Sequence, residues 1–210
     1  MIRILIADDH TIVREGLKQI VSETPDMMVA DEAITGHEVL DKALKNDYDV
    51  VVLDITMPGI SGLDVLKQMK KQKPKLSILV LTMHPEEQYA VRALKSGASG
   101  YLTKESASEE LIYAIRQISS GRKYITSSLA EKLAFGIEKD AEKPLHETLS
   151  DREYHVFCMI ASGKTVKEIS ESLFLSAKTV STYRARILEK MNMKNNAELT
   201  RYAIKHGLVE

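Results

Sequence analysis

The run Tyr48-Asp49-Val50-Val51-Val52-Leu53-Asp54 gives the clearest indication of the fold of this 210-residue chain. Its central residues are continuously apolar, which is typical of a strand covered on both faces of a parallel sheet. A carboxylate follows at once, and then the turn-like sequence Ile55-Thr56-Met57-Pro58-Gly59. The pattern predicts a buried strand that places Asp54 at the carboxyl edge of a sheet, where open α/β folds hold their chemistry.

Three other apolar runs also end in polar side chains. Ile4-Leu5-Ile6-Ala7 leads into Asp8-Asp9, Ile78-Leu79-Val80-Leu81 into Thr82, and Tyr101-Leu102-Thr103 into Lys104. Because parallel strands end at one edge, we expect three carboxylates, a hydroxyl and an ammonium to converge there. Carboxylates suit a divalent cation such as Mg²⁺, and the whole set suits a phosphoryl group.

Strand-like runs alternate with amphipathic helical stretches from Arg3 to about Gly121, which predicts a doubly wound, five-stranded parallel sheet in an α/β domain. The expected strands are Arg3–Ala7, Met27–Ala33, Asp49–Asp54, Ser77–Leu81 and Gly100–Leu102. The expected helices are His10–Ser22, Gly36–Asn46, Gly62–Lys71, Pro85–Ser96 and Ser106–Ser119.

The pattern changes after this region. Between Ser127 and Pro144, helical spacing of leucines gives way to a highly charged stretch, which predicts a short helix and an exposed linker. From Glu147 onward only helical periodicity remains, and the expected helices are Ser150–Ser162, Thr165–Leu173, Ser176–Met191 and Ala197–Lys205. We therefore predict a domain at residues 1–122, a linker at 123–146 and a smaller all-α domain at 147–210.

Composition limits the class of protein. A 44% apolar and 28% charged chain can form a packed core. The chain has a single cysteine, Cys158, and its start lacks the features of a signal peptide. It also lacks an apolar run of about 20 residues, which a membrane span would need. We therefore predict a cytoplasmic protein with no membrane partner. The net charge is +2 from Glu147 onward and -3 before it, so the C-terminal part is the better candidate for binding a polyanion.

Each polar residue at the sheet edge also has an ordinary interpretation. Asp8 and Asp9 could cap a helix, and Asp54 could be a surface turn residue. Lys104 could be a solvated lysine, Thr82 a simple strand-end residue and Tyr101 a packed strand residue. As a functional set, Asp54 would instead be the nucleophile that forms an aspartyl-phosphate, and Lys104 and Thr82 would contact phosphoryl oxygens.

Together, in this order on successive strands, these residues resemble the receiver domain of bacterial response regulators, over Met1 to about Arg122. The resemblance implies phosphorylation of Asp54 and a switch formed by Thr82, Tyr101 and Lys104. It also implies a Mg²⁺ site formed by the acid pair Asp8 and Asp9, by Asp54 and by the carbonyl of Thr56. Glu105 departs from the proline that many receivers carry after the lysine, which removes the expectation of a cis-proline there.

The C-terminal domain contains a helix-turn-helix pattern, which consists of a short helix, the turn Phe174-Leu175-Ser176 and a longer basic helix. Val180, Ile187, Leu188 and Met191 are expected to form its buried stripe. The alternative, by composition alone, is a small helical bundle with a solvated charged face. Arginine and lysine supply phosphate contacts to DNA, while serine and threonine can also donate to base edges.

The C-terminal sequence resembles the LuxR-type helix-turn-helix over nearly all of Leu149–Val209, and with the receiver the chain resembles a NarL/FixJ-type response regulator. Val166 and Tyr183 replace the asparagine and histidine usual in that family. The resemblance implies that the last helix, Ala197–Lys205, pairs two protomers. It implies double-stranded DNA binding by Lys178, Thr179, Ser181, Thr182, Arg184 and Arg186.

We therefore expect a transcriptional regulator, not an enzyme, that a sensor histidine kinase phosphorylates on Asp54 with Mg²⁺ and that acts as a homodimer. Two alternatives remain open. A phosphohydrolase of the haloacid dehalogenase type would carry a second aspartate where this chain has Thr56. A DNA-binding protein with an inactive receiver would take up no phosphate from acetyl phosphate.

Overall fold

The computed structural model describes residues 1–126, 129–130 and 144–209. The chain divides into two compact units, Met1–Ala134 and Phe135–Glu210. The short helix predicted after Ser127 and most of the predicted charged linker lie outside the described residues. No described helix has the length and apolarity needed to cross a membrane.

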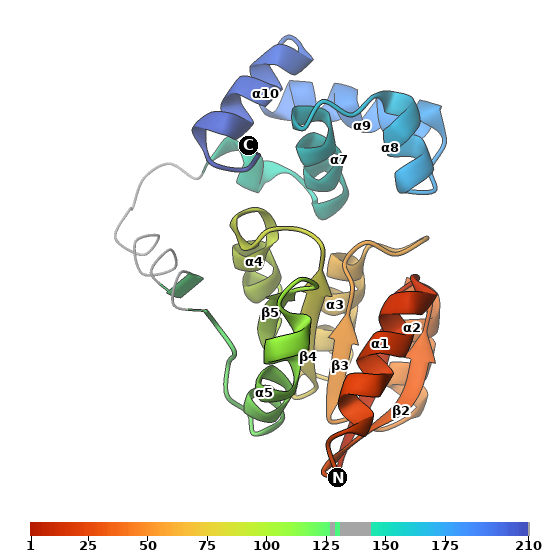
Figure 1. Ribbon diagram of the computed structural model, residues 1–210. Coiled ribbons are helices and arrows are strands. Elements are labelled where there is room, and N and C mark those ends of the chain that lie inside the picture. Colours follow the sequence, from red (N-terminus) through yellow and green to blue (C-terminus); the bar gives the residue numbers. More distant parts are fainter. Residues whose placement is uncertain (127–128, 131–143, 210) are drawn as a thin grey trace. The chain divides into compact units, whose positions relative to one another are not determined.

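Five parallel strands form the sheet of the first unit in the order β2-β1-β3-β4-β5 (Figure 1). The predicted doubly wound sheet is confirmed, and each strand ends within one residue of its predicted bounds. Its strands are β1 (Ile2–Ala7), β2 (Met27–Ala33), β3 (Val50–Leu53), β4 (Ser77–Thr82) and β5 (Gly100–Thr103).

Helices cover both faces of this sheet, with α1 and α5 together on one face and α2, α3 and α4 on the other (Figure 1). All four residues of β3 are buried, as expected for a strand with helices on both sides. The helices are α1 (Thr11–Ser22), α2 (Gly36–Lys45), α3 (Gly62–Gln72), α4 (Glu86–Lys95) and α5 (Ala107–Ser119).

The strand order changes direction between β1 and β3. The chain runs from β1 outward to β2, and then crosses back to β3 on the other side of β1, so loops diverge between β1 and β3. Asp54 N donates to the carbonyl of Ala7 at 2.9 Å, and Lys104 N donates to the carbonyl of Thr82 at 2.8 Å. The sheet register therefore places residues from β1, β3, β4 and β5 at one edge.

Two glycines allow the loop after β3 to close tightly. Gly59 has φ +82°, a left-handed conformation that a side chain disfavours. Gly62 begins α3, and a Cβ there would lie 2.3 Å from the carbonyl oxygen of Asp54. The backbone of α3 thus packs directly against the residue predicted to be phosphorylated.

The second unit is helical throughout its described part, which confirms the predicted all-α domain. It contains a 3-10 turn, η1 (Leu145–Thr148), followed by four helices within one residue of their predicted bounds. These are α7 (Asp151–Ala161), α8 (Val166–Ser172), α9 (Ala177–Lys190) and α10 (Asn196–Lys205).

Side-chain caps explain where these helices begin. Ser150 and Glu153 form a capping box that begins α7, and Thr165 and Glu168 form a second box that begins α8. Ser176 caps α9 by accepting from Thr179 N at 3.0 Å. The turn before α9 contains Phe174 at φ +53°, an uncommon conformation for a bulky residue.

The predicted buried stripe of α9 is correct at three positions. Val180, Ile187 and Met191 are buried, whereas Leu188 is only half-buried. Leu188 follows Ile187 by one residue, and neighbouring helical residues point about 100° apart, so both cannot face the centre of one core. The remaining surface of α9 is largely polar.

Candidate functional site

Lys104 connects two strand ends at the carboxyl edge. Its ammonium lies 2.7 Å from Asp54 Oδ2 and 2.6 Å from Asp8 Oδ2. Asp8 and Asp54 are 1% and 2% exposed, so these ion pairs are shielded from water. Thr56 N donates to the other oxygen of Asp54 at 3.0 Å, which fixes the carboxylate plane. Of the residues predicted to converge at this edge, Asp8, Asp54 and Lys104 therefore contact one another directly.

Burial and charge act in opposite directions on these groups. Burial raises the pKa of the Asp54 carboxyl, although the Lys104 ammonium and Thr56 N favour its ionised form. Burial disfavours the charge on Lys104, but the Asp54 and Asp8 carboxylates outweigh that effect and raise the pKa of Lys104. The site thus holds a carboxylate whose charge depends on a cationic partner.

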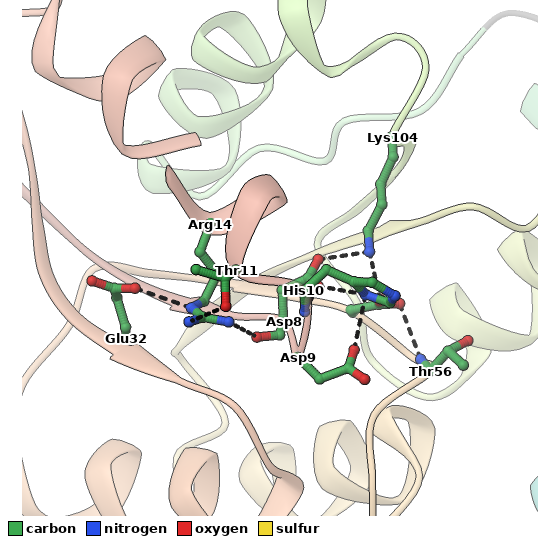
Figure 2. A network of polar contacts seen from close by, with 9 residues as sticks. Asp8, Asp9, His10, Thr11, Arg14, Glu32, Thr56 and Lys104 are labelled. Carbon is green, nitrogen blue, oxygen red and sulfur yellow. Dashed lines mark hydrogen bonds and ion pairs between the residues drawn. The ribbon is translucent and has the colours of Figure 1, made fainter. Parts of the chain in front are cut away.

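A second set of contacts surrounds the acid pair. His10 Nδ1 lies 3.1 Å from Asp8 Oδ1 and 3.0 Å from Asp9 Oδ1, and its backbone N donates to Asp8 Oδ1 at 2.8 Å (Figure 2). One possible ligand atom from each of Asp8, Asp9, His10 and Asp54 lies within 4.8 Å of the others. Three carboxylates so close together form an acidic pocket that suits a hard divalent cation.

Thr82 and Tyr101 meet at the loop between β4 and α4 rather than at Asp54. Thr82 is fully buried, and its Oγ1 accepts from His84 N at 3.4 Å. Tyr101 is also fully buried, and its hydroxyl donates to the carbonyl of His84 at 2.8 Å. Among the described residues, the polar contacts of Asp54 do not include Thr82. Thr82 and Tyr101, two of the predicted switch residues, therefore contact the backbone N and the backbone carbonyl of His84, respectively.

His84 itself joins this loop to the loop after β3. Its Nε2 lies 3.0 Å from Thr56 Oγ1, and its ring packs against Tyr89 of α4 with centroids 4.6 Å apart. The sequence analysis assigned no functional contact to His10 or His84 and so missed both. The position of His10 directly after the acid pair could have indicated it, but His84 lies 28 residues from Thr56 and carries no local signal.

The predicted DNA-binding residues all lie on α9. Lys178, Ser181, Thr182 and Arg186 are exposed, whereas Thr179 and Arg184 are half-buried. Part of this face is a hollow of about 300 Å³, lined by Lys178, Thr179, Thr182, Tyr183 and Arg186. Two cationic and two hydroxyl side chains at one surface are suited to a phosphate backbone.

Three of the six predicted DNA-contact residues on α9 also have partners for their side chains inside the domain. Thr182 Oγ1 donates to the carbonyl of Lys178 at 2.9 Å. Thr179 Oγ1 lies 2.8 Å from Ser176 Oγ at the helix cap. Arg184 Nε donates to Asn196 Oδ1 at 2.7 Å, which ties α9 to the first turn of α10. Tyr183, which replaces the histidine usual in the family, lines the same hollow as Lys178 and Arg186.

Comparison with known families assigns both units. Residues 4–116 match the response regulator receiver domain, and residues 147–203 match the bacterial regulatory proteins of the luxR family. The chain is a response regulator of the NarL/FixJ type. This response regulator is 39% identical to the response regulator UvrY of Escherichia coli (strain K12) over 209 residues, which span 99% of this chain and 96% of UvrY.

A second relative is the response regulator GacA of Pseudomonas aeruginosa, 36% identical over 211 residues that span 100% of this chain and 99% of GacA. Among solved structures, RcsB from Salmonella enterica serovar Typhimurium, bound to promoter rprA in the presence of phosphomimetic BeF3-, has a TM-score of 0.65 and 28% identity. That match covers 96% of this chain and 98% of RcsB. A structure of two RcsB dimers bound to two parallel DNAs matches with a TM-score of 0.60 and 27% identity, over 100% and 99% of the two chains.

The family assignment gives the general function. This response regulator is a phosphorylation-controlled transcription regulator, and its family consists of DNA-binding regulators rather than enzymes in general.

Proposed function

We propose that Asp54 is the residue of this response regulator that a sensor histidine kinase phosphorylates. The observation that carries this proposal is the position of Lys104, whose ammonium lies within 2.7 Å of both Asp54 and Asp8. An ammonium fixed beside a buried carboxylate is placed to neutralise an incoming phosphoryl oxygen. No such arrangement would be needed for a surface aspartate in a turn.

The proposed reaction is a phosphoryl transfer from a phosphohistidine of the kinase. A carboxylate oxygen of Asp54 attacks phosphorus, the P–O bond forms as the P–N bond breaks, and the imidazole leaves with the electron pair. Thr56 N and Lys104 hold the carboxylate in place before the reaction. Lys104 then exchanges part of its contact with Asp54 for a phosphoryl oxygen.

Mg²⁺ is the cofactor that we propose for the acidic pocket. The donor set fits this ion, because Asp8, Asp9 and Asp54 each offer a carboxylate oxygen within 4.8 Å of the others. The carbonyl of Thr56 is the fourth proposed ligand. When bound, the cation neutralises charge on the phosphoryl group and on the carboxylates. His10 contacts both acids of the pair and would have to share them with the cation.

The signal is proposed to leave the site through the loop between β4 and α4. A phosphoryl group on Asp54 offers Thr82 a new acceptor, and the Thr82 hydroxyl would leave the backbone N of His84 to reach it. The backbone carbonyl of His84 accepts a hydrogen bond from the hydroxyl of Tyr101. Because phosphorylation favours one of two loop arrangements, we expect a population shift that also moves the ring of Tyr101.

Double-stranded DNA is the proposed target of the second unit, and the exposed face of α9 is the proposed contact surface. The side chains of Lys178, Ser181, Thr182 and Arg186 are exposed there. We infer that α10 pairs two protomers, since Ile204 on this helix is 55% exposed and solved RcsB structures contain dimers on DNA. A cytoplasmic location follows from these two proposed partners, a kinase and DNA.

Phosphate uptake from acetyl phosphate tests the phosphorylation site. The wild-type chain should gain one phosphoryl group in the presence of Mg²⁺, seen by intact-protein mass spectrometry. Asp54→Asn should gain none, because the amide lacks the anionic nucleophile. Asp47→Asn is the matched control, since Asp47 is an exposed aspartate whose carboxylate lies 3.2 Å from the Lys73 ammonium. Equal uptake by Asp54→Asn and the control would reject Asp54.

A further inference from the structure

Arg14 is a charged residue of α1 that turns inward rather than toward solvent, with 9% exposure. Its three nitrogens reach three different partners near the end of β1 (Figure 2). One donates to the carbonyl oxygen of Asp8 at 2.9 Å, one to Glu32 Oε2 at 3.0 Å, and one to Thr11 Oγ1 at 3.4 Å. The planar guanidinium therefore fixes the orientation of the peptide group that follows Asp8, at the start of the acid pair.

The positive charge of Arg14 is balanced by Glu32 rather than by the acid pair. Glu32 lies on β2, and its carboxylate also accepts from Lys18 at 2.8 Å. Lys18 and Arg14 together lower the pKa of Glu32, against the effect of its burial. The contact of Arg14 with Asp8 is to the main-chain carbonyl, so its effect on the acidic pocket is geometric.

The other polar atoms of Asp8 are held from three directions. Asp8 N donates to the carbonyl of Ala33 on β2 at 3.1 Å, His10 N donates to Oδ1, and Lys104 pairs with Oδ2. Arg14 supplies the contact on the carbonyl that leads into Asp9. Rotation of that peptide group would move the Asp9 carboxylate away from Asp8 and Asp54.

We propose that Arg14 is a positioning residue for the divalent cation: it fixes the peptide between Asp8 and Asp9 and so sets the direction of the two carboxylates. The inference rests on the proposed magnesium site. Groups that orient metal ligands from outside change metal affinity by about 10- to 100-fold when they are removed. Arg14 belongs to that class, although it acts on the backbone of the ligands.

Position and charge have opposite consequences for the affinity of Mg²⁺. If Arg14 acted only as a nearby positive charge, Arg14→Gln would remove repulsion and tighten Mg²⁺ binding, and Arg14→Lys would leave it unchanged. If Arg14 positions the acid pair, both substitutions weaken binding. Lysine keeps one donor but cannot reach the carbonyl and Glu32 at once, so its loss should be smaller than that of glutamine.

The experiment is calorimetric titration of the full-length chain with Mg²⁺ alone, with circular dichroism to confirm that each variant is folded. Arg14→Gln should weaken Mg²⁺ binding by about 10- to 100-fold. Arg14→Lys and Glu32→Gln should give smaller losses, and they carry the test if Arg14→Gln does not fold. Arg116→Lys is the control, because Arg116 makes an exposed pair with Asp26, at 3.0 Å and 3.3 Å, far from the acid pair in sequence.

Unchanged or tighter Mg²⁺ binding in folded Arg14 variants, with normal binding by the wild type, would overturn the role of Arg14 and leave the magnesium site intact. Absence of binding by the wild type would overturn both. Loss of binding in Asp9→Asn and retention in Arg116→Lys would confirm that the titration reports the acidic pocket.

Discussion

Substitution of Lys104 by glutamine should destabilise the receiver unit by an amount that depends on pH and on Mg²⁺. The change leaves the buried carboxylates of Asp8 and Asp54 without the ammonium that now lies within 2.7 Å of both. Removing one partner of a buried ion pair costs about 3–5 kcal/mol. The protein can limit this cost by protonating a carboxyl group.

The cost of that protonation sets the expected magnitude. Bringing an aspartate with an ordinary pKa of about 3.9 to its neutral form at pH 7 costs about 4 kcal/mol, and at pH 5.5 only about 2 kcal/mol. We therefore expect Lys104→Gln to lose about 3–4 kcal/mol at pH 7 and about half as much at pH 5.5. Because burial already raises the pKa of Asp54, that carboxyl should be the one to protonate. Saturating Mg²⁺ should recover part of the loss, since the cation replaces the missing charge.

Urea-dependent hydrogen exchange, read by mass spectrometry on peptides from β1 and β3, measures this change in the intact chain. Peptides from α7 provide an internal reference, and Lys75→Gln provides a control because Lys75 is exposed. An unchanged opening free energy in Lys104→Gln would refute the reasoning. So would a loss of the same size at both pH values with and without Mg²⁺.

Three further predictions concern coupling, DNA and stability. Thr82→Ala should still take up phosphate but dimerise less than phosphorylated wild type in sedimentation, because a contact that distinguishes the two loop states is gone; Thr103→Ala is the control, and equal dimerisation would exclude this route. Lys178→Ala should weaken DNA binding in a filter-binding assay. If Lys178 contacts phosphate, the slope of the logarithm of the binding constant against the logarithm of salt concentration should fall in magnitude by about 1. Lys71→Ala is the control, and equal affinity of wild type and Lys178→Ala would remove Lys178 from the interface. Glu153→Gln should lose about 1–2 kcal/mol at pH 7, because Glu153 accepts from Ser150 and Lys190. These partners lower the pKa of Glu153 despite burial, so the contribution is present above the unfolded pKa of about 4.3 and lost as pH falls below it; a loss of the same size at pH 3 in urea unfolding would contradict this assignment.

Much of the fold was predictable because the signals are local and periodic. Val50 to Leu53 are apolar without interruption, which only a strand covered on both faces explains in this context. Both capping boxes, Ser150 with Glu153 and Thr165 with Glu168, lie within four consecutive residues, so each is a local sequence signal. Four of the five strands, β1, β3, β4 and β5, place a polar residue at the common edge.

The rest depended on contacts between loops, for which the sequence carries no periodic signal. His84 reaches Thr56 across 28 residues, and Arg14 reaches Glu32 across 18. The sequence predicts that Arg184 contacts DNA. In the structure, its Nε donates to Asn196 Oδ1 of α10. In each case the partner is fixed by where a loop or a helix end lies in space, and this is known only after the chain has folded.

The close contact of Gly62 with the carbonyl of Asp54 has a consequence for mutational scanning. A residue with any side chain at position 62 would place an atom 2.3 Å from that oxygen. A saturation library scored by expression of a reporter gene would therefore rank Gly62 beside Asp54, although Gly62 has no chemical group to contribute. Measuring protein abundance in the same library would separate them at the conservative substitution Asp54→Asn. This variant keeps the size of the side chain and leaves Lys104 paired with Asp8, so it should accumulate far better than the Gly62 variants.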